Sequence, residues 1–231
     1  VPLVYDAQRD EFERVIRDQQ SDFSIKSRND NGVLGASKRK SYYTPVTYIS
    51  PYNINKAAQG FDLSSSPSRH ESLHTARDSG EMTATSKIRL VQETGESYGF
   101  LIIAPVYKTN ANDKGPEERA NLLLGYVTGV YRIDTLMARA RVQADKVGLD
   151  LTLYDVEGAE TSLLYGQKSA DAAFSFDILI PDRFWQLNLS INTVLKEKLE
   201  SPSIANWILA GGSLISLLLA ISFYALQTSI I

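Results

Sequence analysis

Hydrophobic residues in the first half of the chain gather in runs that predict β-strands. Residues 98–107, YGFLIIAPVY, are almost all apolar, which is typical of a central strand covered on both faces. Residues 85–92 and 122–132 are predicted strands as well. The segment 44–51 alternates apolar and polar residues and ends at a proline, which also predicts a strand. The polar residues 108–121 predict an exposed loop.

Helical spacing of apolar residues appears at three places. Residues 5–20 predict a highly charged amphipathic helix, which we interpret as the end of a longer N-terminal helix. A Ser-Pro pair and a later glycine are start and stop signals that predict a helix over 67–79. Residues 133–147 predict a third helix.

The second half of the polar region predicts four half-buried antiparallel strands, because apolar and polar residues alternate strictly in it. The order of the elements therefore predicts an α+β fold of two successive antiparallel-sheet modules. The predicted strands of the second module cover residues 149–158, 161–166, 172–180 and 184–192.

A run of twenty uncharged residues, 207–226, follows the second module. At about 1.5 Å per residue it is long enough to cross the roughly 30 Å hydrocarbon layer of a bilayer, so it predicts a transmembrane helix. The alternative is a buried core helix. Gly212, Ser216 and Ala220 recur every four residues, which would let a second helix approach closely in a homodimer. Because the chain starts at Val1 without an initiator methionine, we interpret it as a piece of a longer protein.

Composition narrows the possible functions. The 231 residues contain 24 Lys and Arg, 27 Asp and Glu and no Cys, with a net charge of −3. A nucleic-acid binder would need a surplus of basic residues, so nucleic acid is not an expected partner. The lack of cysteine excludes a thiolate nucleophile and a cysteine-based zinc site.

His70, Glu71 and His74 fit the H-E-x-x-H pattern on the predicted helix 67–79. In metalloproteases this spacing holds Zn²⁺ between two imidazoles while the glutamate activates water, and here Glu81 or Glu93 would have to complete the ligand set. The alternative, which we prefer, is two histidines on a polar helix face, and a calorimetric zinc titration separates the two. No other catalytic set is present, so we expect no enzyme activity, no metal and no cofactor in this segment.

Several motifs follow one another along about residues 9 to 140. They are RDEFE at 9–13, YTPVTYISP at 43–51, NKAAQGFDL at 55–63, Pro67, Arg69, Leu73, Ala76, Gly80, KIRLVQ at 87–92, PVY at 105–107 and GYVTGV at 125–130. Their order resembles the CHASE family of extracellular sensor domains. The family is attached to cyclases and histidine kinases, and its best-known members are plant cytokinin receptors. The segment Gly60 to Ser66 resembles the bacterial members more.

The resemblance implies a receptor of four parts and supplies an orientation for the chain. Residues 1–20 would end a stalk helix, 21–133 would form a membrane-distal PAS-like ligand module, and 134–200 would form a connecting helix and a membrane-proximal PAS-like module. A transmembrane helix at 204–227 would lead to a cytoplasmic histidine kinase or a diguanylate cyclase or phosphodiesterase. Residues 1–203 would then be periplasmic or extracellular.

A small ligand is expected in an apolar pocket of the distal module. The resemblance to cytokinin receptors implies that Asp62 anchors the ligand and that Thr94 helps to hold it. Each residue also has a structural alternative: Asp62 could cap residues 63–65, the tyrosines could be core, and Arg69 could pair with Asp62 or Glu71 instead of a ligand anion. The second hypothesis is sensing through a partner protein. The predicted pocket residues are Asp62, Thr94, Arg69, Tyr48, Phe100, Ile102, Tyr107 and Tyr126.

Overall fold

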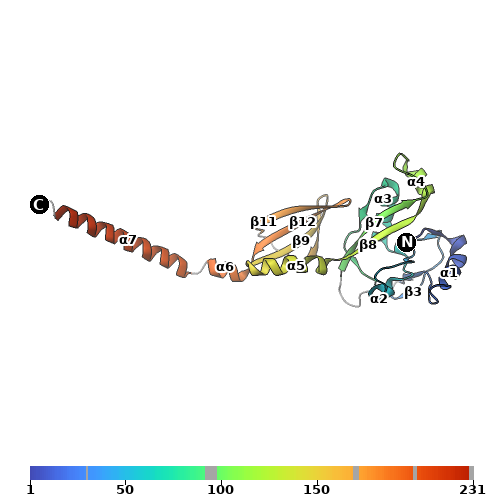
Figure 1. Cartoon of the computed structure of the whole chain (residues 1–231), viewed down its shortest axis with the longest axis horizontal. Helices are drawn as coiled ribbons and strands as arrows, with labels where there is room; N and C mark the ends of the chain where they lie inside the picture. The colour runs from blue at the N-terminus through green and yellow to red at the C-terminus, as the bar shows by residue number, and fades with distance from the viewer. Residues whose placement is uncertain (30, 92–97, 169–171, 200–201, 229–231) are drawn as a thin grey trace.

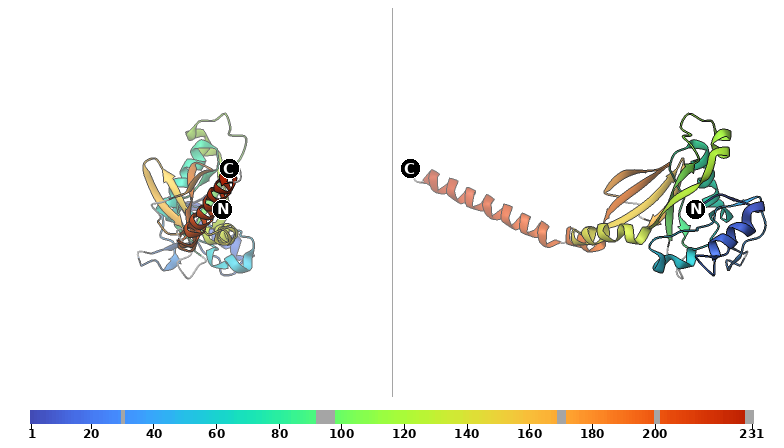
Figure 2. Two further views of the ribbon diagram at one scale, coloured as in Figure 1. Left: turned by 90° about the vertical axis from the view of Figure 1, so that its left-hand side faces the viewer. Right: turned by 45° about the vertical axis from the view of Figure 1, so that its right-hand side comes forward.

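The elements of the chain are arranged along one long axis. A module that contains the N-terminus lies at one end, a second sheet module lies in the middle, and a long helix forms the other end (Figure 1). The right-hand view of Figure 2 shows the same order, and the left-hand view looks along the long axis from the C-terminal end. The computed structural model describes residues 1–29, 31–91, 98–168, 172–199 and 202–228, and in the last helix it describes the side chains of residues 206–220.

The sheet of the first, distal module is built around strand β7 (Tyr98–Tyr107). Strand β8 (Leu123–Arg132) pairs antiparallel with one edge of β7, with Ile102 opposite Gly129. The short strands β5 (Thr83–Ala84) and β6 (Ile88–Arg89) pair with the other edge. The predicted central strand is confirmed, whereas only two residues of the segment 85–92 form a strand and residue 92 lies outside the described residues.

The N-terminal residues pack against this module rather than extending as a helix. Val4 is buried, and strand β1 (Val4–Tyr5) pairs with β4 (Tyr42–Tyr43), so the helix expected over 5–20 begins later, and it also ends earlier, at Arg17. The remaining elements of this region are the 3₁₀-helix η1 (Asp6–Gln8), helix α1 (Arg9–Arg17), and the paired strands β2 (Lys26–Arg28) and β3 (Leu34–Ala36).

The strand expected over 44–51 is wrong. The segment is held by an isolated bridge between Pro45 and Asp62, and by a bond from the Val46 N–H to the Phe61 carbonyl, 3.0 Å. Pro45 has no N–H to donate, which prevents a regular ladder here. The chain continues through helix α2 (Tyr52–Asn55) and the 3₁₀-helices η2 (Lys56–Ala58) and η3 (Leu63–Ser65).

Two further helices of the distal module contact each other, and the first of them also packs against β7 and β5. Helix α3 (Pro67–Ser79) confirms the predicted bounds, and Gly80 ends it in the left-handed conformation with its N–H bonded to the Ala76 carbonyl. The expected loop 108–121 is partly wrong, because α4 (Pro116–Leu122) forms within it. A proline in the first turn followed by two glutamates is a helix start signal.

The second, proximal module confirms the four predicted antiparallel strands. They lie in the order β10, β9, β12, β11, and helix α5 packs against β9 and β10. The bounds are α5 (Ile133–Lys146), β9 (Leu149–Glu157), β10 (Glu160–Tyr165), β11 (Phe174–Ile180) and β12 (Arg183–Ile191).

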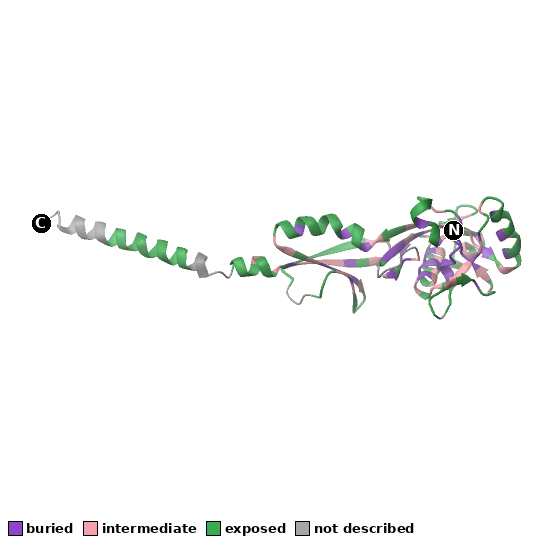
Figure 3. Cartoon of the chain, turned by 90° about the horizontal axis from the view of Figure 1, so that it is seen from below, coloured by how far each residue is buried: buried purple, intermediate pink, exposed green. Residues whose placement is uncertain are grey.

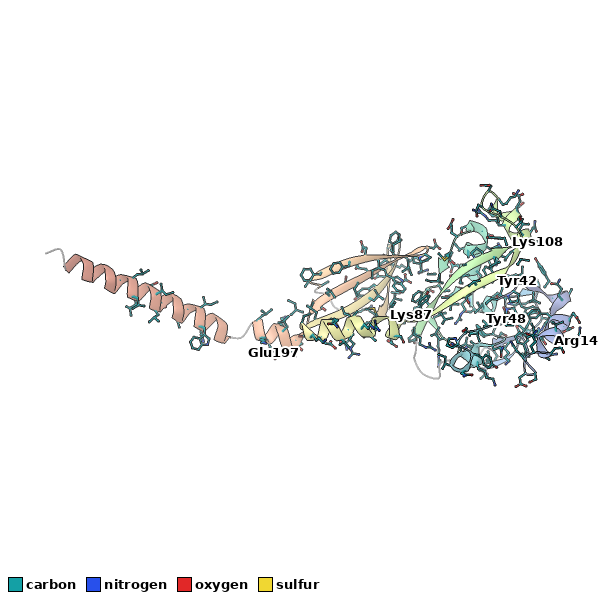
Figure 4. All side chains as sticks on the ribbon, in the orientation of Figure 1. Arg14, Tyr42, Tyr48, Lys87, Lys108 and Glu197 are labelled. Atoms are coloured by element: carbon teal, nitrogen blue, oxygen red, sulfur yellow. The ribbon has the colours of Figure 1, made fainter. Side chains whose placement is uncertain are left out.

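The two modules share strand β7. Leu101 and Ile103 belong to the core of the distal module, whereas Phe100 belongs to the core of the proximal module and meets Trp185 edge-on at 4.7 Å between ring centroids. A side-chain bond also crosses the junction, where the Lys87 ammonium donates to the Leu163 carbonyl at 3.1 Å (Figure 4).

The C-terminal part consists of α6 (Thr193–Leu199) and α7 (Pro202–Thr228). Its described side chains are exposed from 206 to 220, in contrast with the buried residues of the two modules (Figure 3). Among the described residues, no helix combines the length and the apolar character that crossing a bilayer requires. The side chains at 204–205 and 221–227 of the expected span lie outside the described residues, and the span stays a prediction.

Candidate ligand-binding site

The distal module contains a cavity of about 310 Å³, close to the lower limit of roughly 300 Å³ for small-molecule sites. It lies between the segment from residue 46 to residue 63, the first turn of α3 and the strands β7 and β8. Its apolar wall includes Val46, Phe61, Leu63, Leu90, Leu101 and Val130.

A larger hollow of about 720 Å³ lies in the proximal module beside α5, β9 and β10. Its lining mixes charges of both signs, and Arg141 lies 3.8 Å from Asp145 in an exposed pair. Because its charges already face one another in solvent, this hollow is the weaker candidate for specific recognition.

Strand geometry decides which predicted wall residues reach the distal cavity. Side chains alternate along β7, so Leu101 lines the cavity while Phe100 and Ile102 face the proximal module. Tyr48 lines the cavity but its side chain is largely exposed (Figure 4), and its role in ligand binding stays a prediction.

Arg69 is the buried cation of this site. It is only 7% exposed, its Nη2 donates to the Arg89 carbonyl at 2.8 Å, and its guanidinium lies 5.3 Å from the centre of the Phe61 ring. Neither Asp62 nor Glu71 pairs with it, and within the described residues no carboxylate lies within 4 Å of its nitrogens. Burial, with a smaller effect of the Arg28 charge, lowers the pKa of Arg69 to about 10.

Another hollow, of about 500 Å³, adjoins the distal cavity, and Arg69 lines both spaces. Arg28, Lys87 and Arg89 also line this hollow. No aspartate or glutamate of the described chain lines either space, so both are electropositive in a protein with a net charge of −3.

Asp62 is fully buried and does not line the cavity. Its Oδ1 accepts hydrogen bonds from the Thr44 N–H at 2.9 Å, the Ser64 hydroxyl at 2.7 Å and the Ser64 N–H at 3.2 Å. Its Oδ2 has no hydrogen bond of good geometry among the described residues, but the Lys40 ammonium lies 2.6 Å away and compensates its charge. The contact to Ser64 is the cap of η3, the structural alternative for this residue.

Tyr107 and Tyr126 fasten α3 to the sheet. The Tyr107 hydroxyl donates to the Arg77 carbonyl at 2.5 Å, and the Tyr126 hydroxyl donates to the Leu73 carbonyl at 3.0 Å. Burial raises the pKa of Tyr126 well above its usual range. Neither ring lines the cavity, and Thr94 lies outside the described residues. Their roles in ligand binding stay predictions.

The two histidines of the H-E-x-x-H pattern meet on one hydroxyl. The Tyr42 oxygen lies 3.0 Å from Nε2 of His70 and 2.8 Å from Nε2 of His74. Burial, then the nearby charge of Arg77 and then His70, lower the pKa of His74. Among the described residues there is no group of three His, Asp or Glu side chains that could hold a metal ion.

Sequence reasoning missed most of the apolar wall. Leu101 and Val130 lie opposite each other in the β7 and β8 register, but an unbroken apolar run does not reveal which alternate residues face the cavity. Leu63 follows Asp62 directly, and only the buried cap turns it inward while Asp62 points away.

A comparison with protein families identifies the family of the chain. The family model of the CHASE domain matches residues 1–165, which cover the distal module and the elements α5, β9 and β10 of the proximal module. CHASE domains are sensory rather than catalytic. The match covers well over half of the 231 residues, and the chain therefore belongs to the CHASE family, the extracellular sensory domains of signalling receptors.

Proposed function

We propose that the chain senses a small molecule in the distal cavity and relays its binding to an output domain. The observation that carries the proposal is a cavity with an apolar wall and a buried cation, Arg69, that pairs with no carboxylate among the described residues. An apolar cavity with a few aimed polar groups is what small-ligand sites offer. Strand β7 supports the relay, because its two faces pack in different modules.

A cavity-filling variant tests this function. Val130 lines the cavity on β8, whereas Val127 on the same strand does not and is 66% exposed. We expect a thermal-shift screen with adenine derivatives, amino acids and organic acids to give compounds that raise the melting temperature by several degrees. Val130→Trp should abolish these shifts, and the matched control Val127→Trp should keep them. Shifts that survive Val130→Trp would place the ligand elsewhere.

Attachment to a membrane through the C-terminal helix is a separate part of the proposal. The run 207–226 has no charged residue, and large apolar side chains such as Trp207, Leu214 and Leu218 are exposed. Release of the full chain from membranes by alkaline carbonate would refute the anchor. The homodimer through Gly212, Ser216 and Ala220, and a histidine kinase or cyclic-dinucleotide enzyme as the output, belong to the same proposal.

A partner protein is the second candidate signal. Strand β11 is one edge strand of the proximal sheet, and Phe174, Phe176 and Ile178 are exposed on it. Such a row of apolar side chains on a free edge is the kind of surface that another chain can cover. Replacing Phe176 with lysine should abolish signalling in this case while ligand-induced thermal shifts remain unchanged.

A further inference from the structure

We infer that the sensed molecule is an organic anion, whose carboxylate or similar group pairs with Arg69 while its apolar body fills the distal cavity. The inference rests on the proposed small-molecule function and names its ligand class. It starts from a buried positive charge, Arg69, which forms no ion pair with any carboxylate that the structure describes.

Arginine is rarely buried unless an anion compensates it. The guanidinium of Arg69 has five N–H donors, and its hydrogen bond within the described chain uses one, to the Arg89 carbonyl. The side-chain atoms fully enclosed without a hydrogen bond in the described chain are Asp62 Oδ2 and Trp185 Nε1. The unused N–H donors of Arg69 are therefore accessible from the distal cavity and from the adjoining hollow, both of which this residue lines.

The surroundings of Arg69 favour an anion over a neutral ligand. Arg28, Lys87 and Arg89 line the adjoining hollow, and no described carboxylate is close enough to form an ion pair with any of them. The exposed Arg28 guanidinium donates to the Gly32 carbonyl at 2.7 Å, a neutral acceptor. An anion that enters meets a positive field in which no carboxylate of the described residues already occupies Arg69.

The shape of the site defines the rest of the ligand. A guanidinium presents two parallel N–H groups that match a carboxylate, which a single ammonium does not offer. Phe61 lies under the guanidinium, and Leu63 and Leu101 continue the wall beyond it. A ligand with one anionic end and a small apolar body satisfies both parts of this surface.

The test compares matched charged and neutral probes on the full chain in detergent. Sodium benzoate and sodium phenylacetate are titrated beside benzamide and phenylacetamide, with sodium chloride holding the ionic strength constant. We expect the carboxylates to raise the melting temperature and the amides to have little effect. Arg69→Met should weaken carboxylate binding by about ten- to a hundredfold, because it removes charge-assisted hydrogen bonds.

Two further variants keep the test decisive. Arg69→Lys keeps the positive charge but lacks the two parallel N–H groups, so it should retain a weakened response to carboxylates. This variant also tests the inference if Arg69→Met fails to fold. Arg14→Met is the matched control, since Arg14 is an exposed arginine on α1 that pairs with Glu11 (Figure 4). Its carboxylate response should equal that of the wild type.

The outcomes separate this inference from the proposed function. Equal shifts with carboxylates and amides, lost in Val130→Trp but kept in Arg69→Met, would overturn the anion inference and leave the cavity function intact. No shift with any probe would overturn the inference and would also count against the cavity. A carboxylate response that Arg14→Met removes as strongly as Arg69→Met would show a general charge effect and overturn it too.

Discussion

Replacing Asp62 with alanine should destabilise the distal module and leave the cavity able to bind. The change removes a fully buried carboxylate that accepts hydrogen bonds from the Thr44 and Ser64 backbone and pairs with Lys40. Ser64 N keeps a second acceptor, Thr44 Oγ1 at 2.9 Å, so the Thr44 N–H is the backbone donor that is left unsatisfied.

The magnitude follows from these contacts. An unsatisfied buried donor costs about 1 to 3 kcal/mol, and breaking a buried ion pair costs about 3 to 5 kcal/mol when the remaining charge stays buried. The Lys40 side chain is 33% exposed and can turn toward water, which places the expected loss near 3 kcal/mol. For a chain of this size the loss lowers the melting temperature by about 6 to 12 °C.

Thermal unfolding followed by circular dichroism measures the change, and Asp62→Asn should lose roughly half as much because it keeps an acceptor at Oδ1. Asp10→Ala is the control, since Asp10 forms an exposed pair with Arg39 and should cost less than about 1 kcal/mol. If Asp62→Ala melted within about 2 °C of the wild type but no longer bound a ligand, the carboxylate would be a ligand anchor and this reasoning would be refuted.

Two other predictions concern backbone conformation and pH. Gly60→Ala should destabilise by more than about 2 kcal/mol, because an added Cβ would lie 2.1 Å from the Ser24 carbonyl oxygen. Gly32→Ala, with a similar positive φ of 75° but open space, should cost only about 1 kcal/mol in the same denaturant titrations. The lowered pKa of His74 means that the unfolded chain takes up protons first, so stability should fall as the pH drops below 6.5. His74→Gln should flatten the fall in melting temperature between pH 7.5 and 5, and equal slopes in both proteins would contradict this.

Local sequence patterns predicted many of the helices and strands. Helix α3 lies between the Ser-Pro start and the Gly80 stop, and the proximal strands follow the alternation of their side chains. The pattern failed at residues 44–51, because alternation describes the faces of an extended chain but does not provide the hydrogen-bonding partner that Pro45 interrupts.

The site was less predictable than the fold. Tyr48 and Arg69 line the cavity, but the missing partner of Arg69 depends on where distant carboxylates lie after folding. The resemblance gave Asp62 a ligand-binding role, and its capping of Ser64 was a local alternative, but its contacts with Lys40 and Thr44 form only in the folded chain. Charge pairing between segments far apart in sequence leaves no periodic signal.

The strand held in common by the two cores has a consequence for hybrid receptors. A chimera that joins residues 1–132 of this protein to a foreign domain would expose Phe100 and Ala84 to solvent. The residues that pack with them, Met137 and Trp185, lie beyond residue 132 and would be lost. Transplants should therefore exchange both halves together, and a junction placed near residue 192, after the last strand of the proximal sheet, is the natural point for grafting this receptor head onto another effector.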